Sequence, residues 1–216
     1  MSRIVYLHGF ASGPSSKKAR FFQERFARLG VELEIPDLAD GDFEHLTITG
    51  QLKVIERVSR SEPVSLIGSS MGGYLAALYA AVHAEVEKLV LMAPAFSFVT
   101  RWPESLGQEK FEQWRNTGYL PVFHYADGRE RQLRYDLIED GRFYEDYPNV
   151  QQPAIIFHGK NDTVVPPGYS ITFSQQHTNT TLHLLDSDHE LLDVMDLMWT
   201  EARKFLLPAM NAHETG

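Results

Sequence analysis

The chain has 216 residues, a formal net charge of -9 and no cysteine. An acidic chain lacks the basic surface that nucleic-acid phosphates require, so we expect no nucleic-acid partner. Without cysteine there is no disulfide, thiol nucleophile or thiolate metal ligand. The apolar run at the N-terminus is too short for a secretory signal, and no stretch approaches the roughly 18 to 20 apolar residues that cross a bilayer. We therefore expect one cytoplasmic domain over residues 1–216, with no membrane span.

Strand-like and helix-like segments alternate along the chain. Short, β-branched apolar runs are typical of buried parallel strands. They cover residues 4–7, 31–35, 64–67, 89–92, 154–157 and 181–185. Amphipathic or apolar segments of helical length cover residues 17–29, 46–58, 74–82 and 189–207. The alternation predicts an α/β fold, a mostly parallel sheet of about six strands flanked by helices.

One long segment, about 97–150, interrupts this alternation and is far longer than an ordinary crossover. We expect helices over residues 104–115 and 132–140. The segment is either a peripheral insertion that packs on itself or a cap that shapes a substrate pocket. Its many aromatic side chains favour the cap, because they need apolar surface to cover. Trp102 and Trp114 are the candidate pocket residues.

The strongest motif is Gly68-Ser69-Ser70-Met71-Gly72-Gly73, which follows an apolar strand and opens a helix of small residues. A serine on such a tight turn is raised above the sheet edge, and the turn leaves no room for side chains at the two flanking glycines. The alternative is a glycine-rich or phosphate-binding turn. Neither a Gly-Lys-Ser/Thr ending nor a Gly-x-Gly-x-x-Gly spacing is present, so we interpret Ser70 as a nucleophile.

A serine nucleophile needs a base, and the base needs an orienting acid. In this architecture both follow the serine on later strand-to-helix loops, in the order acid then histidine. Asp162 lies beyond the strand at 154–157, and His189 lies beyond the strand at 181–185. Of the nine histidines, His189 alone occupies such a loop downstream of the acid, whereas His158 ends a strand and more plausibly braces its loop. Three rival acids lie close to His189 in the sequence: Asp186, Asp188 and Asp193.

The transition state of acyl transfer needs two donors for its oxyanion. One is the backbone N–H of Met71, the residue after the nucleophile. The other lies in the loop after the first strand, which reads His8-Gly9-Phe10, and the Phe10 N–H is the expected donor.

Together these loops resemble the α/β-hydrolase superfamily over nearly the whole chain. The run His8-Gly9-Phe10-Ala11-Ser12, followed by Ser15, Ser16 and Lys17, resembles YqiA-like bacterial esterases. The cap is similar to that of a mitochondrial palmitoyl-protein thioesterase that also cleaves acyl glucuronides, at Gly118-Tyr119, at 134–138 and at Asp188-His189. The resemblance implies a sheet without the two leading antiparallel strands, and a carboxylic ester or thioester substrate.

The expected activity is hydrolysis of a small-molecule ester or thioester through an acyl-enzyme on Ser70, with no metal and no organic cofactor. Three alternatives stay open. The same triad serves other reactions, and the run 189–193 approaches a zinc-helix pattern, although its last position is Asp193 rather than a histidine. The third is a ligand-binding protein that keeps the fold without turnover. Either a monomer or a homodimer fits the sequence.

Overall fold

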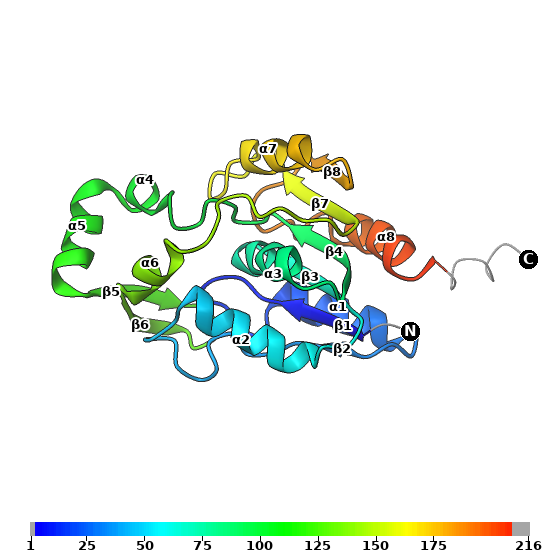
Figure 1. The fold of residues 1–216 in the computed structure, drawn as a ribbon, viewed down its shortest axis with the longest axis horizontal. Helices are drawn as coiled ribbons and strands as arrows, with labels where there is room; N and C mark the ends of the chain where they lie inside the picture. The colour runs from blue at the N-terminus through cyan, green and yellow to red at the C-terminus, as the bar shows by residue number, and fades with distance from the viewer. Residues whose placement is uncertain (1–2, 209–216) are drawn as a thin grey trace, which may run out of the picture.

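Six parallel strands form the central sheet of the computed structural model, which describes residues 3–208 (Figure 1). The strands lie in the order β2-β1-β3-β4-β7-β8, and every neighbouring pair is parallel. Their bounds are β1 Arg3–Leu7, β2 Leu33–Glu34, β3 Val64–Ser69, β4 Val86–Met92, β7 Ala154–Gly159 and β8 Thr180–Leu185. The expected α/β-hydrolase fold with about six strands is confirmed.

Helices cover both faces of this sheet, and each face has its own apolar core. On one face lie α2 (Ile48–Ser59), α3 (Met71–Val82) and α7 (Gly168–Gln176). On the other lie α1 (Lys17–Ala27) and α8 (Met195–Leu206). The small, apolar residues of α3 leave it almost entirely buried, as its composition predicts. No helix within residues 3–208 is long and apolar enough to cross a membrane.

The last helix begins later than expected. The sequence pattern predicts a helix from residue 189, but α8 starts at Met195. Leu191 adopts a positive φ of 55°, and the Asp188 carboxylate accepts hydrogen bonds from the backbone N–H groups of Glu190 and Leu191. These side-chain contacts stabilise a loop where helical spacing alone predicts a helix. His189 is therefore carried by a loop.

The segment between β4 and β7 lies beyond the carboxyl ends of the sheet strands (Figure 1). It contains α4 (Trp102–Leu106), α5 (Gln108–Thr117), the antiparallel hairpin of β5 (Tyr119–His124) and β6 (Arg129–Arg134), and α6 (Asp136–Gly141). The helix expected over 104–115 is divided at Gly107, whose φ of 85° ends α4. The prediction of a helix over 132–140 is wrong in its first part, because residues 132–134 belong to β6. The hairpin is mostly exposed, so it lacks the apolar run that marks a buried strand.

Because the turn after β3 is tight, we expect one extra methyl group at Gly72 to lower the stability of the fold strongly. A Cβ at Gly72 would overlap the backbone carbonyl groups of Leu7 and His8, neither of which can move without distorting β1. We expect Gly72→Ala to lower the free energy of unfolding by about 3 kcal/mol, measured by urea denaturation. Gly168→Ala is the matched control, because a Cβ there meets no atom within 4 Å and the φ is ordinary. Equal stability of the two variants would contradict the packing argument.

Candidate active site

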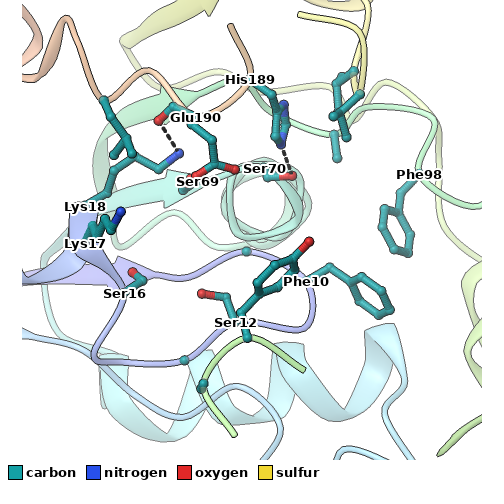
Figure 2. A pocket seen from close by; sticks show the side chains of 18 of the residues that line it. Phe10, Ser12, Ser16, Lys17, Lys18, Ser69, Ser70, Phe98, His189 and Glu190 are labelled. Atoms are coloured by element: carbon teal, nitrogen blue, oxygen red, sulfur yellow. Dashed lines mark hydrogen bonds between the residues drawn. The ribbon is translucent and has the colours of Figure 1, made fainter. Parts of the chain in front are cut away.

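Ser70 occupies a strained turn between β3 and α3. Its φ of 53° and ψ of -117° are unusual for a residue with a side chain, and such strain persists only where neighbours hold it. The Ser70 N–H donates to the carbonyl oxygen of Met92 at 2.8 Å, and its own carbonyl oxygen accepts from the Ala95 N–H at 3.0 Å. The end of β4 thus fixes the Ser70 backbone, and the serine side chain is directed into a cavity (Figure 2).

His189 lies between Ser70 and Asp162. Its Nδ1 is 2.7 Å from Asp162 Oδ2, and its Nε2 is 3.2 Å from Ser70 Oγ. Because an ionised carboxylate only accepts, Nδ1 carries the hydrogen, and in the neutral ring Nε2 is left to accept from the serine hydroxyl. The structure therefore brings the three expected residues into one hydrogen-bonded series, from three different loops.

Asp162 accepts three hydrogen bonds and contacts His158, although its side chain is buried. One oxygen receives the backbone N–H groups of Val164 and Val165, at 2.9 and 2.8 Å. The other faces His189 and His158, the latter with Nε2 at 3.1 Å. Burial by itself raises the pKa of this carboxyl group, but the close contact with His158 and the hydrogen bonds from His189 and Val165 outweigh burial and hold the pKa well below its usual range. Asp162 is thus held as an anion beside His189.

His158 is more closely tied to the site than the sequence indicates. It is fully buried at the end of β7, and its Nε2 donates to the Val165 carbonyl oxygen at 2.8 Å while facing Asp162. Its Nδ1 is 2.7 Å from the hydroxyl group of Ser170 in α7. The expectation that His158 braces its loop holds. Its contact with Asp162 was not predicted, and only its spacing of four residues from the acid could have suggested it.

The three rival acids near His189 are engaged elsewhere. Asp188 caps the loop after His189, and Asp186 accepts from the Asn161 side chain at 3.0 Å. Asp193 accepts from the Ser187 hydroxyl group. Among the described residues no group of three or more His, Asp or Glu side chains could hold a metal ion. The zinc-helix pattern over 189–193 also lies outside α8.

The two expected oxyanion donors flank the Ser70 turn. Met71 is the first residue of α3, so its N–H has no partner within the helix. The Phe10 N–H takes part in no hydrogen bond within the part of the chain that the structure describes. His8 holds the Phe10 loop, because its Nδ1 donates to the Gly9 carbonyl oxygen and its Nε2 accepts from the Leu38 N–H. Two backbone donors are thus available beside the serine.

A cavity of about 810 Å³ opens over Ser70 and His189. Figure 2 shows its two unlike sides, with Phe10 and Phe98 on one side of Ser70 and Ser16, Lys17 and Lys18 on the other. On the first side Phe10, Phe98 and Trp102 form a cluster in which each pair of ring centroids lies 5.7–5.9 Å apart. The segment 97–150 contributes much of this wall, so it does not pack only on itself.

The two tryptophans expected in the pocket differ in position. Trp102 lines the cavity. Trp114 does not, because it lies behind Trp102 at a ring distance of 5.1 Å and is only 1% exposed. Its indole N–H donates to the Leu133 carbonyl oxygen, which ties α5 to the hairpin. Trp114 therefore packs behind the wall and does not line the cavity.

Residues 3–206 match the model of an uncharacterised protein family, UPF0227. The chain belongs to this family. This membership confirms the expected resemblance to YqiA-like proteins. A protein of Mycoplasma pneumoniae named "Putative esterase/lipase 2" is 25% identical to this chain, in an alignment that covers 83% of this chain and 78% of that protein.

Solved structures agree on the fold of this UPF0227 member. Est1E from Butyrivibrio proteoclasticus has a TM-score of 0.78 and 20% identity, over 97% of this chain and 88% of that chain. Mouse alpha/beta hydrolase domain-containing protein 10 has a TM-score of 0.76 and 22% identity, over 94% of this chain and 88% of that chain. The protein thus has the α/β-hydrolase fold.

The lowered pKa of Asp162 links stability to pH. A carboxyl group whose folded pKa lies below its unfolded value of about 3.9 stabilises the protein above that pH, and the contribution is lost as the pH falls. We expect the free energy of unfolding to fall more between pH 5 and pH 3 in the wild type than in Asp162→Asn. Urea denaturation at stepped pH measures the difference. Equal losses in the two proteins would show that Asp162 titrates normally.

Proposed function

We propose that this UPF0227 member hydrolyses carboxylic esters or thioesters through an acyl-enzyme on Ser70. The observation that carries the proposal is the hydrogen-bonded series from Ser70 through His189 to Asp162, which lies next to two free backbone donors in an open cavity. A serine hydroxyl group with such a base reacts with carbonyl carbon, whereas a serine without one does not.

In the first step His189 Nε2 takes the proton of Ser70 as Oγ bonds to the carbonyl carbon of the substrate. The carbonyl oxygen becomes an oxyanion, which the N–H groups of Phe10 and Met71 stabilise. As the carbon–oxygen or carbon–sulfur bond breaks, His189 passes its proton to the leaving group. Asp162 keeps the ring in the required tautomer and stabilises the charged imidazolium.

In the second step water takes the place of the leaving group. His189 removes one proton from water as its oxygen attacks the acyl carbon, and the same two amides stabilise the second oxyanion. The bond between the acyl carbon and Ser70 Oγ then breaks, and His189 returns the proton to the serine. The acid leaves and the enzyme is regenerated, so the cycle requires no cofactor.

The aromatic side of the cavity supports an apolar or aromatic acyl group. The aromatic rings of Phe10, Phe98 and Trp102 offer flat apolar surface in the same cavity as Ser70. Burial of such an acyl group against these rings removes apolar area from water, which favours binding. In one solved structure ferulic acid, an aromatic acid, is bound to Est1E. Est1E has the same fold as this chain, which is compatible with a preference for aromatic acyl groups here.

The nucleophile is tested with a fluorophosphonate probe, which reacts with activated serines. We expect one adduct per chain on Ser70, located by mass spectrometry, and no adduct on Ser70→Ala. Hydrolysis of p-nitrophenyl butyrate should fall by at least about a thousandfold in that variant. Ser69→Ala, which changes the neighbouring serine, is the matched control. Absence of an adduct on folded protein would favour a ligand-binding protein without turnover.

The aromatic wall is tested with two tryptophan variants. We expect Trp102→Ala to raise KM for p-nitrophenyl esters of aromatic acids about tenfold, because it removes apolar surface from the cavity. The acetate ester should change little, since its acyl group does not reach the ring. Trp114→Phe is the control and should lower the midpoint of thermal unfolding without a selective change in KM. An unchanged KM in Trp102→Ala would remove Trp102 from the acyl site.

A further inference from the structure

The side of the cavity away from the aromatic cluster is basic, although the chain as a whole is acidic. Lys17, Lys18 and Arg20 line it, and Glu190 is the only carboxylic residue among the lining residues that the structure describes. Lys17 and Arg20 are exposed and form no ion pair within residues 3–208. The formal net charge of the chain is -9, yet Lys17 and Arg20, which form no ion pair among residues 3–208, both line the cavity of the candidate active site.

Helix α1 begins at this side of the cavity. Ser16 caps the helix through the Ala19 N–H at 3.3 Å, whereas no hydrogen bond engages the N–H groups of Lys17 and Lys18 in the described structure. The helix has 11 residues, so its first turn carries the partial positive charge of a full helix dipole. Free amides at the start of a helix bind anionic oxygen atoms.

A buried hydroxyl group provides an independent indication of a ligand. Tyr6 in β1 is 0% exposed and lines the same cavity, yet its hydroxyl group has no hydrogen-bond partner among residues 3–208. The hydroxyl groups of Ser16 and Ser69 interact with it electrostatically, but neither completes a hydrogen bond with it in the described part of the chain. An unpaired buried hydroxyl group is costly, so a ligand that accepts its hydrogen bond gains that energy back.

Lys18 and Glu190 determine how the charges balance. Lys18 is buried, and its Nζ donates to the backbone carbonyl oxygen of Glu190 at 2.9 Å (Figure 2). Burial lowers the pKa of Lys18, and its hydrogen bond holds the loop that carries His189. The exposed Glu190 carboxylate has no ion pair in the described part of the chain and opposes an anion nearby. The exposed cations Lys17 and Arg20, together with the start of α1, outweigh it.

We infer that the basic side of the cavity is a subsite for an anionic oxygen group of the substrate, a carboxylate or a phosphate, bound by Tyr6, Lys17, Arg20 and the first amides of α1. The inference rests on the proposed function and narrows it to esters or thioesters that carry an anion on the part facing α1. The aromatic side faces the other part of the substrate. The enzyme then selects a substrate with one apolar end and one charged end.

The test compares anionic and neutral esters of one alcohol or acid. The pairs are 3-carboxy-4-nitrophenyl butyrate against 4-nitrophenyl butyrate, and the 4-nitrophenyl monoester of glutaric acid against the 4-nitrophenyl ester of valeric acid. A third anionic ester, 4-(phosphonooxy)phenyl butyrate, tests phosphate against phenyl butyrate. For each variant we measure kcat/KM for the anionic ester divided by kcat/KM for its neutral partner. We then compare this ratio with that of the wild type, so that the intrinsic reactivity of the two esters cancels.

The expected result is a fall in this ratio of about tenfold for Lys17→Gln/Arg20→Gln, and a smaller fall for Tyr6→Phe, which removes only the hydroxyl group. Glu190→Gln should raise the ratio. Lys110→Gln/Arg115→Gln changes the net charge equally on α5, outside the cavity, and should leave the ratio unchanged. The ester pair whose ratio falls shows whether the anion lies on the acyl group or on the leaving group of the substrate, and whether it is a carboxylate or a phosphate. Equal ratios in all variants would overturn the inference.

A binding measurement separates this inference from the proposed function. Phenyl phosphate, benzoate and neutral benzamide are titrated into Ser70→Ala by calorimetry. Tighter binding of either anion, lost in Ser70→Ala/Lys17→Gln/Arg20→Gln, supports the subsite even if no ester is hydrolysed. Equal binding of benzamide and both anions would overturn the subsite even if neutral esters are hydrolysed through Ser70.

Discussion

The close approach of two backbone segments, the loop after β1 and the turn after β3, is the constraint on which the site depends. Gly72 brings the start of α3 against the carbonyl groups of Leu7 and His8, at a separation that no side chain allows. That contact places the Phe10 and Met71 amides on either side of Ser70. Ser70 adopts its strained conformation just before this contact, and the bonds to Met92 and Ala95 hold it in place. The same backbone contact therefore positions both the proposed oxyanion donors and the proposed nucleophile.

Asp162 is the second organising element, and it links the ends of β7 and β8. Its two oxygen atoms bind the loop that carries it, through Val164 and Val165, and the loop that carries His189. His158 adds a contact from inside the sheet and reaches α7 through Ser170. The carboxylate is thus fixed on four sides before a substrate binds. A base oriented this way needs little reorganisation when it accepts a proton, which is what electrostatic preorganisation means in physical terms.

Much of this arrangement could be predicted from local pattern. The glycines around Ser70 indicate a turn that has no room for side chains at positions 68 and 72. The loops that carry the serine, the acid and the histidine could be expected to lie together, because the carboxyl ends of the parallel strands meet at one edge. What could not be predicted depends on contacts distant in sequence. The β5–β6 hairpin is exposed and lacks an apolar run, and the Asp188 carboxylate replaces the first turn of the expected last helix with a loop. Trp114 and Trp102 look alike in the sequence, yet only packing decides which of them faces the cavity.

The loop after β1 does more than supply one oxyanion donor. The ring of Phe10 belongs to the aromatic cluster, whereas a few residues later Ser16 and Lys17 border the basic side. The tip of the hairpin rests on this loop, because the Tyr125 N–H donates to the Ala11 carbonyl oxygen at 2.8 Å. A change in this loop therefore alters the oxyanion donor, both walls of the cavity and the seat of the hairpin together. Under the proposed function, substrate preference is consequently coupled to catalysis through one short stretch of backbone. The segment 97–150 contributes Phe98 and Trp102 to the aromatic wall.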